Sequence, residues 1–276
     1  MNNIKLSITI PSYKDPLLKK TVEGLLANSE LGDGLEIIIS LDGYWVNPED
    51  IVDDKRVKYL HLGGNRGMKG AINAGMAIAS GEFVGRLDEH CKFCKGYDKL
   101  LTDSCKPNQI MTPRRYFLDP VKWEVMEEKG YVDSEKLVIQ DCGNGIRKFS
   151  GQKWKSRDEK FKDVQIFESF AVQGSFWIIP RALWEKAVGA FDSDRFGPHQ
   201  QDSHELTFKV WQKGGELVVN KDVWFAHKHR SFSRCHNNGT KENPANAEQS
   251  YKSMLDEYEQ YYNDVIVPRM YKKENK

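Results

Sequence analysis

The chain has 276 residues, of which 39% are hydrophobic and 29% charged, a composition typical of a globular protein rather than a disordered or fibrous one. Lysine and arginine number 41 against 40 aspartate and glutamate residues, so the net charge of +1 argues against a protein that binds polyanions over its whole surface. No run approaches about 18 consecutive apolar residues, so no transmembrane helix is expected.

The start of the chain is strand-like and lacks the basic segment, long apolar segment and cleavage site of a secretory signal. The five cysteines are an odd number in a chain of this length and do not suggest a disulfide framework. We therefore expect a cytoplasmic protein in a reducing environment.

The first third of the chain alternates strand and helix patterns. Strands are predicted at 6–10, where Pro11 is expected to end the strand, and at 36–41, 57–60 and 82–87, with helices over 17–26 and 67–79. This order predicts an α/β fold, in which a Rossmann-like, mostly parallel, twisted sheet is flanked by helices. Asp42 and Asp88 follow two of these strands, at the sheet edge where such folds bind ligands.

The rest of the chain is less regular at first and then resumes the alternation. Segment 148–162 holds six basic and two acidic residues with aromatic residues between them, which fits either a solvated surface or contacts with nucleic-acid phosphates and bases. Strands are predicted at 174–179 and 216–219, helices at 181–188, 203–212 and 247–262, and a mobile loop at 230–246. We expect one continuous domain, with halves at 1–111 and 112–262 and a basic tail at 263–276.

Asp88 and His90 lie two residues apart, just past the fourth predicted strand. A carboxylate and an imidazole at this spacing can face one point, and these donors suit Mn²⁺ or another divalent cation. Taken alone, the same pattern also fits a surface turn. His227 and His229 follow a later predicted strand, and one of them could complete a metal site or belong to a basic surface cluster.

Asp202 and Glu205 lie at the start of the helix predicted from Ser203. Carboxylates near a helix N-terminus are favoured by the helix dipole, so helix capping explains this pattern without any catalytic role.

The N-terminal half resembles family 2 glycosyltransferases, which have the GT-A fold. The matching segments are Ile10-Pro11-Ser12-Tyr13, the strand-end Asp42, Asn65-Arg66-Gly67, Asn73-Ala74-Gly75, and 79–83 running into Leu87-Asp88. The second half more specifically resembles the catalytic domain of polypeptide N-acetylgalactosaminyltransferases. Their D-x-H-C motif, followed at a fixed spacing by a glycine and an aromatic residue, matches Asp88, His90 and Cys91 with Gly96 and Tyr97. Their E-L-S-F-R-V-W-Q-C-G-G-E-L resembles 205–217, G-H-x-F-R resembles 226–230, and M-D-E-Y-x-x-F-Y-Y resembles 255–262.

This resemblance implies a UDP-sugar donor and a bound Mn²⁺ or other divalent cation, with Asp88, His90 and His227 as metal ligands. It implies that Tyr13 stacks on the uracil. The donor-binding candidates are Pro11, Ser12, Tyr13, Asp42, Asn65, Gly67, Asn73, Arg86 and Gly174. The loop 230–246 takes the place of the family's lid, which would exclude water from the donor.

The sequence also departs from that family. Residues 198–202 replace its W-G-G-E motif, so that Asp202 is the one acid left there, and the helix at 67–73 is closer to family 2. The donor sugar is therefore open. Neither a lectin domain nor a Golgi anchor is expected. We therefore do not expect a eukaryotic mucin-type enzyme.

Inverting family 2 enzymes carry a base in an E-D-x-[DE]-L pattern, which falls on Ser203 when aligned on Glu205-Leu206. Because serine is a poor base, this favours transfer with retention, in which Asp202 and Glu205 orient sugar and acceptor. A shift of one residue would make Asp202 the base.

Several alternatives stay open. One is an inverting family 2 transferase that builds polysaccharide. The acceptor could be a glycan, a protein or a hydroxymethylated base in DNA. From another functional class, the chain could be a non-catalytic protein that binds a nucleotide sugar. The oligomeric state is not predicted.

Overall fold

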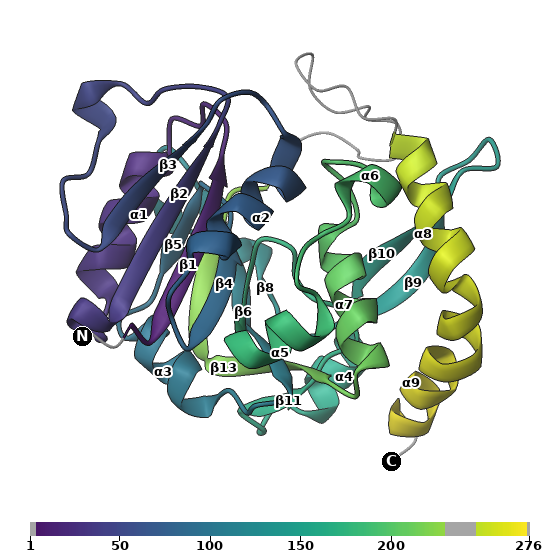
Figure 1. Ribbon diagram of the computed structural model, residues 1–276. Helices are drawn as coiled ribbons and strands as arrows, with labels where there is room; N and C mark the ends of the chain where they lie inside the picture. Colours follow the sequence, from purple (N-terminus) through teal and green to yellow (C-terminus); the bar gives the residue numbers. More distant parts are fainter. Residues whose placement is uncertain (1–3, 230–246, 275–276) are drawn as a thin grey trace.

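The computed structural model describes residues 4–229 and 247–274 (Figure 1). Four parallel strands form one side of the sheet in the order β3-β2-β1-β4, namely β1 (Leu6–Ser12), β2 (Leu35–Asp42), β3 (Val57–Leu62) and β4 (Phe83–Leu87). Every residue of β2 is buried, as its apolar run predicts. Together with α1 (Leu18–Asn28) and α2 (Gly67–Ile78), these strands confirm the predicted α/β fold.

The prediction that Pro11 ends the first strand is wrong, because β1 continues through Pro11 to Ser12. The pairing of β1 explains why proline is tolerated. Pro11 lies opposite Ser40 of β2, whereas β4 pairs with β1 only from Leu6 to Thr9. At Pro11, β1 therefore pairs with one neighbouring strand rather than two, so that a residue without a backbone N–H is tolerated there.

The other side of the sheet continues into the second half of the chain. Strand β12 (Phe176–Pro180) runs antiparallel to β4, and β6 (Gln109–Asp119), β13 (Glu216–His227) and β11 (Ile166–Glu168) extend the sheet beyond it. The short β5 (Cys91–Phe93) pairs with β13, while β7 (Glu124–Val125) and β8 (Tyr131–Val132) pair with β6. One sheet thus runs through both halves of the sequence.

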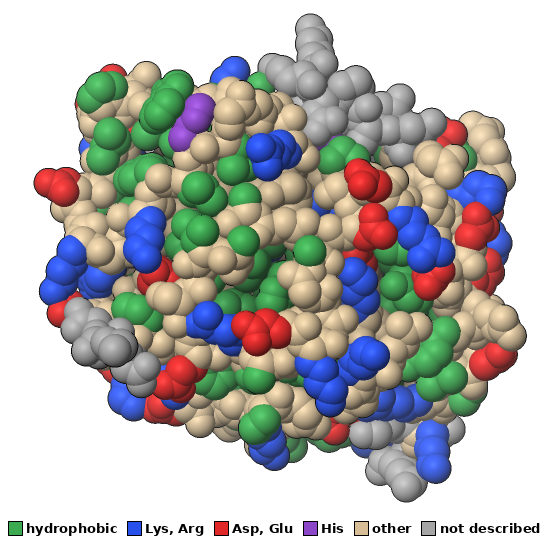
Figure 2. All heavy atoms as spheres, in the orientation of Figure 1, with side chains coloured by type: hydrophobic (Ala, Val, Ile, Leu, Met, Phe, Trp, Pro, Cys, Tyr) green, Lys and Arg blue, Asp and Glu red, His purple; other side chains and the backbone are tan. Residues whose placement is uncertain are grey.

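The middle of the chain is more regular than predicted. Besides β6, it contains an antiparallel pair, β9 (Glu135–Asp141) and β10 (Arg147–Lys153), followed by α4 (Lys155–Lys160). Phe149 and Trp154 are buried in the core, so these aromatic side chains are not available to stack on nucleic-acid bases. On the face shown in Figure 2, basic and acidic side chains are interspersed, in keeping with the net charge of +1.

The remaining helices are α3 (Tyr97–Ser104), α5 (Arg181–Ala187), α6 (Ser193–Phe196), α7 (Asp202–Gln212), α8 (Ala247–Tyr261) and α9 (Val267–Glu274). A π-helical turn at Tyr262–Ile266 joins α8 to α9. The predicted basic tail is therefore helical as far as Glu274, with Ile266 and Met270 buried. Within the described parts of the chain, no helix has the length and apolar character needed to cross a membrane.

Two apolar clusters cover the two faces of the sheet. Helices α1 and α3 pack on one face, against Leu6, Ile8 and Ile10 of β1, and α2, α5, α7 and α8 contribute to the cluster on the other. Gly75 lets α2 approach the sheet closely, because a Cβ there would lie 2.3 Å from the Thr9 side chain. Cys91, Cys94 and Cys105 are free thiols, but Cys142 is disulfide-bonded, unlike the expectation of a chain without disulfides.

Candidate metal centre

Three residues from distant parts of the sequence form a cluster at one end of the sheet. Asp88 directly follows β4, His90 directly precedes β5, and His227 is the last residue of β13, where it lies opposite Cys91 of β5. One potential ligand atom from each of Asp88, His90 and His227 lies within 4.8 Å of the others. The residues proposed as a metal triad from the sequence therefore lie together in space.

The charges of this cluster are set by its immediate neighbours. Asp88 Oδ1 lies 2.6 Å from Arg86 Nη2, and Asp88 Oδ2 lies 3.0 Å from His227 Nε2. Burial raises the pKa of Asp88, but Arg86 and His227 outweigh burial and hold that pKa well below its usual range. Burial lowers the pKa of His227 to about 4, although Asp88 acts in the opposite direction. At neutral pH the cluster thus has an ionised carboxylate and a neutral imidazole, the forms that bind a cation.

Two acidic residues that the sequence did not single out lie beside the cluster. Asp15 Oδ2 lies 2.9 Å from His90 Nδ1. Glu89 accepts a hydrogen bond of 2.8 Å from the backbone N–H of Tyr13, and burial raises the pKa of Glu89 to about 7. A signal for Asp15 existed in the sequence, since it lies in the loop between the first predicted strand and helix, at the sheet edge where ligands bind.

Several buried polar atoms next to the cluster have no hydrogen-bond partner among the described residues, including Arg86 Nε and Nη1, Ser175 Oγ and Asp202 Oδ2. Two contacts show how these segments lie relative to Asp88. The backbone N–H of Asp88 donates a hydrogen bond to Ser175 O, and a Cβ on the adjacent Gly174 would lie 3.4 Å from Ser203 Oγ. Buried polar atoms are usually paired, so such a group points to water, an ion or a ligand. Arg86 and the Gly174-Ser175 segment thus contact Asp88 or lie next to a residue that does, and Gly174 also lies close to Ser203, the neighbour of Asp202 in the chain.

Asp42, Asn65 and Gly67 also lie together, at the start of α2. Asp42 Oδ1 and Oδ2 accept hydrogen bonds from the backbone N–H groups of Arg66 and Gly67, at 2.6 and 3.0 Å. Burial raises the pKa of Asp42 despite these bonds. Asn65 Nδ2 lies 3.5 Å from Asp42 O, and Asn65 Oδ1 is buried with no partner among the described residues.

Pro11 and Ser12 are the last two residues of β1, which lies between β2 and β4, and Tyr13 directly follows the strand. Ser12 Oγ is hydrogen-bonded to Tyr44 OH, and the Tyr13 ring meets Tyr44 edge to face with centroids 6.1 Å apart. A cavity of about 430 Å³ opens beside them. Its lining includes Asp15, Tyr44 and Trp45.

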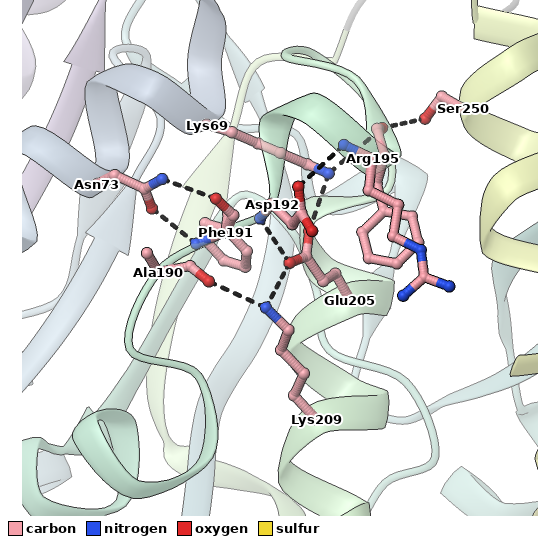
Figure 3. Close-up of polar contacts among 10 residues, drawn as sticks. Lys69, Asn73, Ala190, Phe191, Asp192, Arg195, Glu205, Lys209 and Ser250 are labelled. Atoms are coloured by element: carbon pink, nitrogen blue, oxygen red, sulfur yellow. Dashed lines mark hydrogen bonds and ion pairs between the residues drawn. The ribbon is translucent and has the colours of Figure 1, made fainter. Parts of the chain in front are cut away.

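Asn73 and Glu205 have different surroundings (Figure 3). The Asn73 side chain makes two hydrogen bonds of 2.8 Å with the backbone of Phe191. Glu205 is fully buried, and its oxygens contact Lys69 Nζ at 2.9 Å, Lys209 Nζ at 2.7 Å and Asp192 N–H at 2.8 Å. In this arrangement both side chains hold the segment before α7 rather than face the metal cluster. The predicted lid, 230–246, lies outside the described residues.

Replacing Gly67 by alanine should lower the free energy of unfolding by about 2 kcal/mol or more, because its φ of 77° disfavours a side chain and its Cβ would lie 2.5 Å from Pro198 Cβ. Gly24→Ala is the matched control, since Gly24 lies within α1 and nothing would lie within 4 Å of its Cβ. That change should stabilise the protein by up to about 1 kcal/mol. Urea unfolding of both variants measures the difference, and equal effects would contradict the role given to Gly67.

Comparison with known proteins shows the family to which this chain belongs. The model of the family described as "Glycosyl transferase family 2" matches residues 7–183. Polypeptide N-acetylgalactosaminyltransferase 5 of Caenorhabditis elegans is 27% identical over 219 residues, which cover 76% of this chain and 33% of that protein. A GalNAc(5)-diNAcBac-PP-undecaprenol beta-1,3-glucosyltransferase of Campylobacter jejuni is 35% identical over 99 residues, which cover 33% of this chain and 31% of that protein.

A crystal structure of GalNAc-T7 with UDP, GalNAc and Mn²⁺ has a similar fold, with a TM-score of 0.71 and 16% sequence identity. The superposed region covers 94% of this chain and 50% of the GalNAc-T7 chain. The chain spans about a third of the length of the curated relatives it matches. The family model covers more than half of the chain, and the sheet with its flanking helices matches the fold of the solved structure. The chain therefore belongs to glycosyl transferase family 2 and has the GT-A fold.

Proposed function

We propose that this protein is a metal-dependent glycosyltransferase that moves a sugar from a UDP-sugar to a hydroxyl acceptor. The observation that carries the proposal is the cluster of Asp88, His90 and His227 at the ligand-binding end of a GT-A sheet. A structural neighbour, GalNAc-T7, was solved with UDP, GalNAc and Mn²⁺, which supports the same kind of donor and cation here.

The residues fit Mn²⁺ or a similar divalent cation. One carboxylate oxygen and two imidazole nitrogens form a mixed oxygen and nitrogen donor set, and the pKa shifts of Asp88 and His227 favour their ligating forms at neutral pH. When bound, such a cation would supply stabilisation of the negative charge that develops on the UDP leaving group. Arg86, buried against Asp88, adds a fixed positive charge at the same place.

We assign the donor contacts to two groups. Pro11, Ser12, Tyr13, Asp42, Asn65 and Gly67, at the ends of β1 and β2 and the start of α2, bind the nucleotide. Arg86, Gly174 and Asp202 contact the donor sugar, in line with the unpartnered atoms of Arg86 and Asp202. Asn73 and Glu205 act as positioning residues, because their polar atoms are engaged inside the protein.

We propose transfer with retention of configuration. Ser203, at the position of the base of inverting enzymes, cannot take up a proton unaided, and Glu205 is fully buried in ion pairs. Asp202, with one buried oxygen unpartnered, is the residue that would serve as base in an inverting enzyme. The anomeric configuration of the product, read by NMR, separates the two: an inverted product would overturn retention and point to Asp202.

The sugar and the acceptor are left open by the relatives themselves, since one is named for N-acetylgalactosamine transfer and another for glucose transfer. The test is UDP release from a panel of UDP-sugars, each with Mn²⁺ or with EDTA, and with glycan, peptide or hydroxymethylated DNA acceptors. We expect Mn²⁺-dependent release from one donor, increased by one class of acceptor. UDP binding without release from any donor would instead support a non-catalytic binding protein, and release that EDTA does not affect would contradict the metal centre.

A further inference from the structure

We infer that Asp15 is a positioning residue for His90, whose ring it orients so that Nε2 is the nitrogen presented to the cation. The inference rests on the proposed metal centre. His90 Nδ1 lies 2.9 Å from Asp15 Oδ2, and the two side chains are only 10% and 16% exposed. Because a carboxylate accepts the hydrogen bond of an Nδ1–H group, the neutral ring keeps its free lone pair at Nε2.

Asp15 is itself held in place. Its other oxygen, Oδ1, accepts a hydrogen bond of 2.8 Å from the backbone N–H of Leu17, at the entry to α1. The carboxylate is thus fixed between the helix entry and the His90 ring, and it cannot rotate without losing one of these two contacts.

The backbone around His90 is held by other residues. Thr21 Oγ1, from α1, donates to Glu89 O at 2.7 Å and accepts from Cys91 N–H at 3.1 Å. His90 O accepts a further hydrogen bond of 3.1 Å from Lys228 N–H. The backbone on both sides of His90 therefore keeps its contacts when Asp15 is changed, so that the orientation of the ring is what depends on Asp15.

This arrangement predicts an effect on metal affinity. Partners that hold a ligating histidine typically account for about 10- to 100-fold in metal affinity. Asp15→Ala should therefore weaken Mn²⁺ binding by about 10- to 100-fold, and Asp15→Asn, which keeps an oxygen acceptor for Nδ1–H, should weaken it less.

The experiment measures the Mn²⁺ affinity of the full chain from the electron paramagnetic resonance signal of the free ion. Asp50→Asn is the matched control, because Asp50 lines the same cavity as Asp15 but accepts its side-chain hydrogen bond from Asn47 rather than from His90. It should leave the affinity unchanged. A second readout needs no metal: nitrogen NMR of the His90 ring should show Nδ1 protonated in the wild type and a mixture of tautomers in Asp15→Ala. Thermal unfolding checks that each variant is folded. If Asp15→Ala does not fold, the Mn²⁺ affinity of Asp15→Asn tests the inference in its place.

The outcomes separate this inference from the proposed function. If Asp15→Ala binds Mn²⁺ as the wild type does while His227→Ala does not, the metal centre stands and the role of Asp15 is wrong. If His227→Ala also binds like the wild type, or the wild type does not bind Mn²⁺, the proposed metal centre is wrong and the role of Asp15 with it.

Discussion

The His227→Ala protein should lose UDP-sugar turnover by at least about a thousandfold. A divalent cation contributes several kcal/mol to stabilising a diphosphate leaving group, and each reduction of about 1.4 kcal/mol in the barrier is a factor of ten in rate. Steady-state UDP release in saturating Mn²⁺ measures the loss, and the affinity for UDP alone should fall far less. His227 lies at the end of β13, so its removal leaves the sheet pairing in place.

His61→Ala is the control for this prediction. His61 lies on β3 and stacks on Trp45 with centroids 3.7 Å apart, outside the cluster of potential ligands. Its turnover should match the wild type. Asp88→Asn is a second test of the centre, and it is preferable to Asp88→Ala because an asparagine oxygen still accepts a hydrogen bond from the buried Arg86. Nearly full turnover of the folded His227→Ala or Asp88→Asn protein would be incompatible with the metal centre.

Glu205→Ala should lower the free energy of unfolding by about 3–5 kcal/mol, because it leaves the ammonium group of Lys69 buried without its partner. Lys69 and Glu205 are both 0% exposed, and the pair links α2 to α7. Glu205 also accepts from Lys209 and from the backbone of Asp192, so the segment before α7 loses further contacts (Figure 3). Urea unfolding with a constant m-value measures the change.

Two further variants test the stability effect assigned to this ion pair. In the double variant Lys69→Met with Glu205→Gln, no charge of this pair stays unpaired, so it should recover part of the lost stability. Asp103→Ala removes one partner of the exposed pair of Lys99 and Asp103 and should leave the unfolding midpoint unchanged.

If Glu205 contacts substrate instead, a Glu205→Gln protein of normal stability would show a large fall in kcat, which would contradict the positioning role of Glu205.

The strands of the first half could be predicted because their apolar runs are local and because parallel strands buried on both faces are recognisable without knowledge of the rest. The pairing of β13 with β5 was not predictable in this way, since it joins Cys91 to His227 and only 216–219 had a strand pattern. The resemblance to glycosyltransferases, not the local pattern, selected His227 over His229.

Side-chain environments were the least predictable part of the site. Glu205 shares a helix start with Asp202, yet one is fully buried in ion pairs and the other has an unpartnered oxygen. That difference arises from Lys69, which lies more than a hundred residues earlier in the chain. The contact of Asp15 with His90 likewise spans 75 residues. Phe149 and Trp154, read as a surface pattern beside lysines, lie in the core because β10 and the segment after it pack against α7 and α8.

The most direct test of the metal centre is crystallographic. Crystals of the protein grown with Mn²⁺ and UDP, measured at the manganese absorption edge, should give an anomalous peak between Asp88, His90 and His227, next to the diphosphate of UDP. An anomalous peak elsewhere, or UDP bound with no manganese at these three residues, would contradict the proposed metal-dependent transfer.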